Sequence, residues 1–248
     1  MILAILQARS SSTRFPNKVL ADLGGQPMIL QQIKRLKRSK LIDKLVVATT
    51  TDPSDDQLVE LLQGQGIPFY RGSLDNVMKR FIDVIQNEKP DIVVRLTADC
   101  PLADARVIDL VIQEHISSGS EYTSNTLKPT YPDGLDVECF VPKTLQNIYD
   151  SNPSEIECEH VTYGLYNRPD FCTTHSVEQE VNRSNLRWTV DLPEDLDFVR
   201  AVYSAFESDC YSFGQEDLVE MAQTKPEFHR TDTILERNAS LIEQESGL

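Results

Sequence analysis

Short apolar runs alternate with amphipathic segments along the first 120 residues of the chain. The runs are nearly continuous in apolar residues, which is typical of strands that are covered on both faces. We expect four such strands, at residues 2–6, 44–50, 67–70 and 92–96. Because an amphipathic segment separates each strand from the next, this order predicts a mainly parallel sheet with helices on both of its faces.

Helix-start signals support this order of elements. Pro27 and Pro53 each precede a run of apolar residues at helical spacing, and proline is favoured at the start of a helix because its missing N–H costs nothing there. We expect helices after Pro27, from Pro53 to about residue 63, at about 75–87 and at about 104–117. The chain is therefore predicted to be a doubly wound α/β protein.

The pattern changes after residue 120. We expect strands at 137–141, 171–177 and 187–190, helices near 142–150 and 155–167, and a further helix after Pro193. These elements predict a mixed edge on the sheet, with an excursion at about 122–180 that covers a pocket. One domain should span residues 1–222, and residues 223–248 should form a polar C-terminal tail that packs loosely or adds a short helix.

The charge balance narrows the class of partner. The chain has 248 residues and a net charge of −15, so it lacks the basic surface that nucleic acids and anionic membranes attract. No apolar run approaches the roughly 20 residues that span a bilayer. Its five cysteines are odd in number and show no CxxC spacing, which predicts free thiols in a cytoplasmic protein.

One segment opposes the acidic balance. The first twenty-one residues hold three cations (Arg9, Arg14 and Lys18) and no anion, and they follow directly on the first predicted strand. In an open α/β sheet, ligands bind at the ends of such strands, and cations there can neutralise a polyphosphate. The glycine patterns of dinucleotide folds and P-loops are absent from this segment. The alternative is a basic surface loop.

Two aspartates also lie at strand ends. Asp99 follows the strand at 92–96, and Asp191 lies between the strand at 187–190 and the helix that starts at Pro193. Carboxylates beside phosphates are typical ligands of Mg²⁺. The alternatives are a turn or helix-capping role for Asp99 and the N-cap of the following helix for Asp191.

Further polar residues lie in the second half of the chain. Asp136 and Glu138 are two residues apart in a predicted strand, so their side chains should share one face, and Asp133 comes just before them. These acids could bind sugar hydroxyls or could form a solvated edge. His160 lies on a predicted helix and could belong to the site. The alternative is a histidine that only packs or forms hydrogen bonds within the fold.

Seven segments in order resemble a known family. They are QARSSSTRFPNKVL, VVATTTDPSDD, RGSLDNVMKRF, RLTADCPL, DGLDVECF, EHVTYGLY and RWTVDLPEDLDFV, and they cover about residues 1–206. The chain is similar to the cytidylyltransferases of spore-coat polysaccharide biosynthesis type, which are related to CMP-acylneuraminate and CMP-3-deoxy-manno-octulosonate synthetases. The resemblance implies a doubly wound fold of the nucleotide-diphospho-sugar transferase type.

The resemblance also implies an activity, which is transfer of CMP from CTP to a sugar acid or related sugar with release of pyrophosphate. The implied nucleotide-binding residues are Ala8, Arg9, Ser12, Arg14, Lys18, Thr97 and Asp99, with Arg9, Lys18 and Asp99 catalytic. Asp99 and Asp191 would hold Mg²⁺. The excursion with Asp133, Asp136, Glu138 and His160 would cover the sugar, and the family allows for a homodimer.

Two other functions stay open at this point. One is a nucleotidyltransferase that acts on a sugar 1-phosphate and makes an NDP-sugar. The other is a non-catalytic protein that binds nucleotide-sugars. The segment Ala98–Asp99–Cys100–Pro101–Leu102 differs from the corresponding Gly-Asp-Glu-Pro-Leu type segment of the octulosonate enzymes, which leaves the acceptor sugar undetermined.

Overall fold

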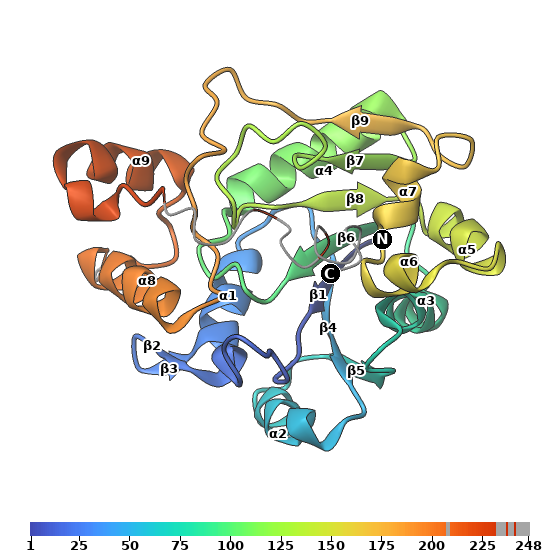
Figure 1. Cartoon of the computed structure of the whole chain (residues 1–248), viewed down its shortest axis with the longest axis horizontal. Coiled ribbons are helices and arrows are strands. Elements are labelled where there is room, and N and C mark those ends of the chain that lie inside the picture. The colour runs from blue at the N-terminus through green and yellow to red at the C-terminus, as the bar shows by residue number, and fades with distance from the viewer. Residues whose placement is uncertain (207–208, 232–236, 238–240, 242–248) are drawn as a thin grey trace.

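A seven-stranded sheet forms the centre of the molecule (Figure 1) in a computed structural model that describes residues 1–206, 209–231, 237 and 241. Its strand order is β5-β4-β1-β6-β8-β7-β9. The strands are β1 (Ile2–Gln7), β4 (Lys44–Thr50), β5 (Phe69–Gly72), β6 (Ile92–Thr97), β7 (Tyr122–Ser124), β8 (Glu138–Phe140) and β9 (Thr174–Ser176). Two short strands, β2 (Asp22–Leu23) and β3 (Gln26–Pro27), pair separately.

The first four strands of this order are parallel, and the rest form the mixed edge. β8 runs antiparallel to both β6 and β7, whereas β9 is parallel to β7. From β1 the chain goes to β4 on one side and later returns to β6 on the other side. The order therefore reverses between β1 and β6, where open α/β sheets bind their ligands. The predicted fold class, doubly wound and mainly parallel with a mixed edge, is confirmed.

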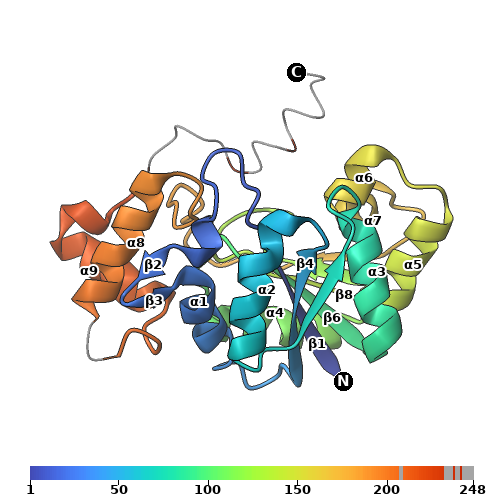
Figure 2. The same cartoon turned by 90° about the horizontal axis from the view of Figure 1, so that it is seen from below.

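Helices cover both faces of the sheet (Figure 2). Successive side chains of β1 enter different cores: Ala4 and Leu6 pack with α1, α2, α4, α8 and α9, while Leu3 and Ile5 pack with α3, α5 and α7. The helices are α1 (Met28–Leu36), α2 (Asp56–Gly64), α3 (Val77–Glu88), α4 (Ala105–Ser118), α5 (Pro142–Asp150), α6 (Glu155–Glu159), α7 (Tyr163–Asn167), α8 (Pro193–Ala205) and α9 (Gln215–Thr224).

The structure corrects several predictions for the second half of the chain. Residues 187–190 form no strand; only an isolated bridge joins Arg187 to Asp133. The predicted helix at 155–167 is split into α6 and α7, with Val161 at a φ of 29° between them. Strand β7 was missed because its sequence, YTS, is too polar to give an apolar run.

The C-terminal region also differs from the expectation. Helix α9 was not predicted, and it continues to Thr224, past the expected domain limit at residue 222. Phe228, in a 3₁₀ helix that follows (Pro226–Phe228), is buried. The rest of the predicted tail at 223–248 lies outside the described residues apart from 225, 229–231, 237 and 241, so the domain division stays a prediction.

Arg35 of α1 joins three parts of the chain in the interior. Its guanidinium is 1% exposed and donates to four carbonyl oxygens, at 2.8–3.3 Å. The acceptors are Leu102, Ala103, Cys210 and Phe213. Burial lowers the pKa of this guanidinium below its ordinary value. Arg35 thus fixes the turn after β6 and the segment before α9 against α1.

Arg35→Met should destabilise the fold by roughly 2–4 kcal/mol, because four buried carbonyl oxygens lose their donor. Urea unfolding followed by circular dichroism measures the change. The exposed Arg38, on the same segment, gives a matched control, and Arg38→Met should alter stability by no more than about 0.5 kcal/mol. Equal effects of the two substitutions would contradict the role assigned to Arg35.

Candidate active site

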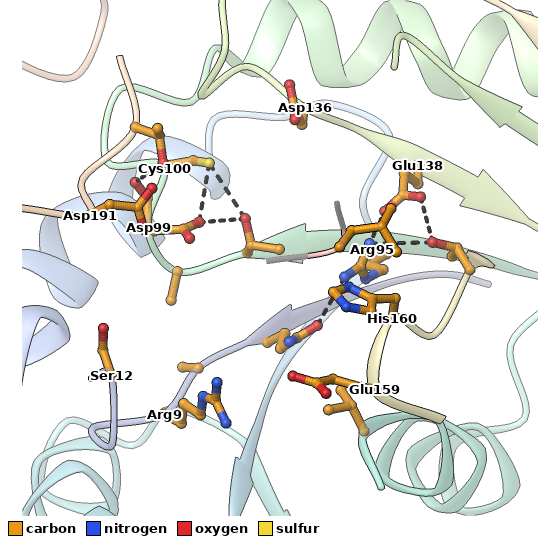
Figure 3. Close-up of a pocket in the computed structure, with 18 of the residues that line it drawn as sticks. Arg9, Ser12, Arg95, Asp99, Cys100, Asp136, Glu138, Glu159, His160 and Asp191 are labelled. Carbon is orange, nitrogen blue, oxygen red and sulfur yellow. Dashed lines mark hydrogen bonds and ion pairs between the residues drawn. The ribbon is translucent and has the colours of Figure 1, made fainter. Parts of the chain in front are cut away.

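A cavity of about 650 Å³ opens at the carboxyl ends of β1 and β6 (Figure 3). All the residues predicted from the sequence to form the site line it. They are Ala8, Arg9, Ser12, Arg14, Lys18, Thr97, Asp99, Asp133, Asp136, Glu138, His160 and Asp191. The strand register explains why the loop after β1 and the turn after β6 lie close together, because Gln7 at the end of β1 pairs with Thr97 at the end of β6.

Backbone N–H groups anchor the loop after β1, both to Asp55 and within the loop. The Ser10 N–H donates to Asp55 Oδ1 at 2.6 Å, and the Asn17 N–H donates to the Ser10 carbonyl at 2.8 Å. Asn17 has a φ of 59°, in the left-handed region, and it turns the chain into the short 3₁₀ helix Lys18–Leu20. This folded loop presents Arg9 and Arg14 as exposed side chains and directs Lys18 inward.

Lys18 is the central cation of the cavity. Its ammonium donates to the Val190 carbonyl at 2.7 Å and to Asp191 Oδ1 at 3.1 Å, and it lies 3.6 Å from Asp99 Oδ2. The side chain is only 10% exposed. One buried ammonium therefore brings together the loop after β1, the turn after β6 and the segment before α8.

Asp99 is kept in its ionised form by this arrangement. Burial raises the pKa of its carboxyl, but the charge of Lys18 and hydrogen bonds from Thr97 (2.6 Å) and Cys100 (3.4 Å) outweigh that effect. The net result is a pKa below the ordinary value for aspartate. Asp99 is therefore a carboxylate at neutral pH, as a cation site requires.

Asp191 is not the N-cap of α8, which was the alternative considered for it. The N-cap is Leu192, and the N–H groups of Asp191 and Leu192 both donate to the carboxylate of Asp195, at 2.6 and 2.7 Å. The Asp191 carboxylate is therefore free of the helix end and faces Lys18, Arg187 and Arg14. Arg187 approaches it to 3.0 Å and Arg14 to 3.3 Å.

The donor set of Asp99 and Asp191 fits a magnesium ion. Both carboxylates already converge on one positive group, Lys18 Nζ, and both offer the hard oxygen ligands that Mg²⁺ prefers. Within the described residues, no cluster of three or more His, Cys, Asp or Glu side chains could hold a metal. Two carboxylates supplemented by phosphate oxygens and water are a common arrangement for Mg²⁺ and do not require such a cluster.

Asp133 and Asp136 line another part of the cavity wall. Gly134 between them has a φ of 105°, and a Cβ there would come within 2.7 Å of the Trp188 backbone, so only glycine fits this close approach. Burial and the charge of Asp136 raise the pKa of Asp133 to about 7. The pKa of Asp136 is also raised, chiefly by burial, although Arg237 opposes that effect.

Glu138 has partners of its own. Its carboxylate pairs with Arg95 of β6 and accepts hydrogen bonds from the hydroxyls of Tyr122 and Thr162, both at 2.6 Å. Asp136 precedes β8, so of the two acids only Glu138 lies in the strand, and both line the cavity. Arg95 was not among the predicted site residues, although an arginine inside the apolar run IVVRLT was a visible signal.

Figure 3 shows how the labelled side chains divide. Asp99, Cys100 and Asp191 lie at one end of the cavity, and Arg95, Glu138, Glu159 and His160 lie at the other. His160 is the C-cap of α6 and belongs to the wall formed by the excursion. The cavity therefore offers a cationic and metal-compatible end and a second polar end.

The cytidylyltransferase family model matches residues 3–232 of the chain. The chain is 34% identical over 209 residues to the spore coat polysaccharide biosynthesis protein SpsF of Bacillus subtilis, covering 82% of this chain and 86% of that protein. It is also 35% identical over 113 residues to the 3-deoxy-manno-octulosonate cytidylyltransferase of Geobacter sulfurreducens, which covers 45% and 44% of the two chains.

A solved structure agrees with these matches. A cytidylyltransferase from Leptospira borgpetersenii superimposes with a TM-score of 0.87 at 29% identity, covering 95% of this chain and 99% of that chain. The predicted resemblance is thereby confirmed, as is the prediction that the chain is an enzyme. The chain belongs to the cytidylyltransferase family, and it is a nucleotidyltransferase.

Proposed function

We propose that this enzyme transfers CMP from CTP to a sugar acid and releases pyrophosphate, in the synthesis of a surface polysaccharide or glycan. The observation that carries the proposal is the contact of Lys18 with both Asp99 and Asp191 at the switch point between β1 and β6. A loop with three cations and a pair of carboxylates at one sheet edge suits a nucleoside triphosphate with its metal.

The triphosphate would lie along the loop after β1. Arg9 and Arg14 are exposed, and guanidinium groups bind phosphate oxygens through two hydrogen bonds at once. Lys18 would add a point charge at the closed end. A hydroxyl of the acceptor then attacks the α-phosphorus in line, and pyrophosphate leaves. The protein's contribution is positioning and charge neutralisation, as in other phosphoryl transfers.

Asp99 and Asp191 would hold Mg²⁺ against the phosphates. The ion, when bound, would stabilise the negative charge that develops on the transferred group. Thr97 fixes the Asp99 carboxylate through a 2.6 Å hydrogen bond, and Arg187 fixes Asp191. These two contacts orient the ligands before any substrate is present.

The acceptor would occupy the part of the cavity that Asp133, Asp136, Glu138 and His160 line. The Geobacter relative that acts on 3-deoxy-manno-octulosonate supports a sugar acid as the acceptor class. Transfer to a sugar 1-phosphate is the second candidate. None of the helices within the described residues is long and apolar enough to cross a membrane. A cytoplasmic location and a homodimer stay predictions.

Asp99→Asn should remain folded and lose about 10²–10³ in turnover, since one ligand and its charge are removed from the reacting phosphates. Pyrophosphate release with CTP, Mg²⁺ and a panel of sugar acids measures the loss. Asp197, which is 71% exposed on α8, gives the matched control Asp197→Asn, which should keep full turnover. Full turnover by Asp99→Asn would contradict the metal assignment.

CTP should protect the wild-type protein against heating, and UTP, GTP and dTTP should not. A ligand at 100 times its Kd adds about 2.7 kcal/mol of stability, which a thermal-shift assay resolves. The measurement compares the melting temperature with each nucleotide in the presence of Mg²⁺. Equal protection by UTP or dTTP would favour the NDP-sugar alternative, and protection without pyrophosphate release for any acceptor would favour a binding protein.

A further inference from the structure

Arg237, from the C-terminal segment, reaches the part of the cavity wall that holds Asp133 and Asp136. Its Nη2 pairs with Asp136 Oδ1, its Nη1 donates to the Tyr131 carbonyl at 3.3 Å, and its Nε lies 4.0 Å from Asp133 Oδ1. The side chain is 16% exposed. Leu241, from the same segment, lines the cavity itself. Two described residues of this segment therefore adjoin the site.

The position of Arg237 in the chain sets it apart from the other site residues. The family match ends at residue 232, whereas the loop after β1, the turn after β6 and the segment before α8 all lie inside it. Arg237 is thus a site-proximal cation that this chain supplies from beyond the matched region.

A count of charges shows what Arg237 contributes. Arg95 is bound to Glu138, and Arg187 is bound to Asp191 and Asp195 while it lies 4.0 Å from Asp133. Among the ion pairs of the described residues, Asp136 has Arg237 as its cationic partner. Without Arg237, Asp136 would be an unpaired, largely buried carboxylate next to Asp133.

An unpaired carboxylate at this place matters for the acceptor. A sugar acid brings its own carboxylate into a cavity whose wall already holds Asp133, Asp136 and Asp99. Like charges a few ångströms apart in a partly desolvated site repel strongly. A guanidinium that pairs with Asp136 and approaches Asp133 removes much of that repulsion.

We propose that Arg237 is a specificity-determining residue, which neutralises Asp136 and Asp133 and so allows the cavity to accept an anionic sugar. This inference rests on the proposed function, because it concerns the acceptor of that reaction. Arg237 acts here through the two aspartates and is a positioning residue. It takes no part in binding CTP, whose phosphates meet Arg9, Arg14 and Lys18.

The test compares four variants of the full chain: Arg237→Gln, Arg237→Lys, Asp136→Asn and the double variant Arg237→Gln/Asp136→Asn. Steady-state pyrophosphate release is measured with CTP, Mg²⁺ and 3-deoxy-manno-octulosonate as the probe acceptor. Arg237→Gln should raise the KM for the acceptor at least tenfold and change the KM for CTP less than twofold. Arg237→Lys, which keeps the charge, should stay within about threefold of the wild type.

The double variant separates neutralisation from other roles. Asparagine keeps the hydrogen-bonding shape of Asp136 and removes its charge, so the double variant should return the acceptor KM to within about threefold of the wild type. A double variant no better than Arg237→Gln would overturn the proposal and indicate direct contact of Arg237 with the acceptor. An unchanged acceptor KM in Arg237→Gln would mean that the Arg237–Asp136 ion pair has only a structural role, and this result would also overturn the proposal.

The control is Arg200→Gln, which removes an arginine that is 44% exposed and pairs with Asp197 on α8. It should leave both KM values unchanged. Melting temperatures of all variants identify any that unfold. If Arg237→Gln unfolds, the double variant still tests the proposal, because a raised acceptor KM in that variant would contradict neutralisation. The proposed function would be contradicted if the wild-type enzyme binds CTP but transfers CMP to no sugar acid. This inference alone would be contradicted if the wild type is active and the Arg237→Gln variant is unaffected.

Discussion

The buried ammonium of Lys18 is the contact on which the site depends. It joins three segments that are far apart in the sequence, through Asp99, Asp191 and the Val190 carbonyl. A buried ammonium without carboxylate partners would be strongly unfavourable, so Lys18 depends on Asp99 and Asp191. The charge of Lys18 also lowers the pKa of Asp99, at the place where a phosphate and its metal would bind.

The sheet brings these segments together. The strand order reverses between β1 and β6, so the segments that follow these strands diverge and leave a cavity between them. Arg35 holds the turn after β6 in place by donating hydrogen bonds to the carbonyl oxygens of Leu102 and Ala103. The mixed edge then adds Asp133, Asp136 and Glu138 from the opposite side. Rigid elements therefore position the polar groups before a ligand arrives.

Much of this could be predicted from the sequence. The apolar runs predicted the parallel strands, because β1, β4 and β6 are buried on both faces. Residues that follow neighbouring parallel strands lie at the same edge of the sheet, as expected. Strand β7 could not be found, since its three residues are polar and are buried only by tertiary contacts. The segment at 187–190 has the apolar pattern of a strand, yet its backbone bonds to two different segments, with Trp188 donating to Asp133 and Val190 donating to Asp99.

The role of single charges was harder to predict. Asp191 precedes a Pro-Glu-Asp helix start, which is the usual place of an N-cap, but the N-cap is Leu192. The Asp195 carboxylate accepts from the N–H groups of Asp191 and Leu192, and the Asp191 carboxylate faces the cavity. Arg237 lies in a polar stretch without periodicity, so nothing in the sequence connected it with Asp136. Long-range pairing between isolated charges is set by the fold and leaves no local pattern.

A crystal structure of the protein with CTP and Mg²⁺ tests the central claim most directly. The triphosphate should lie along residues 8–18, with Arg9, Arg14 and Lys18 on its oxygens and a metal ion held by Asp99 and Asp191. A triphosphate bound elsewhere, or a metal ion bound without either aspartate, would contradict it.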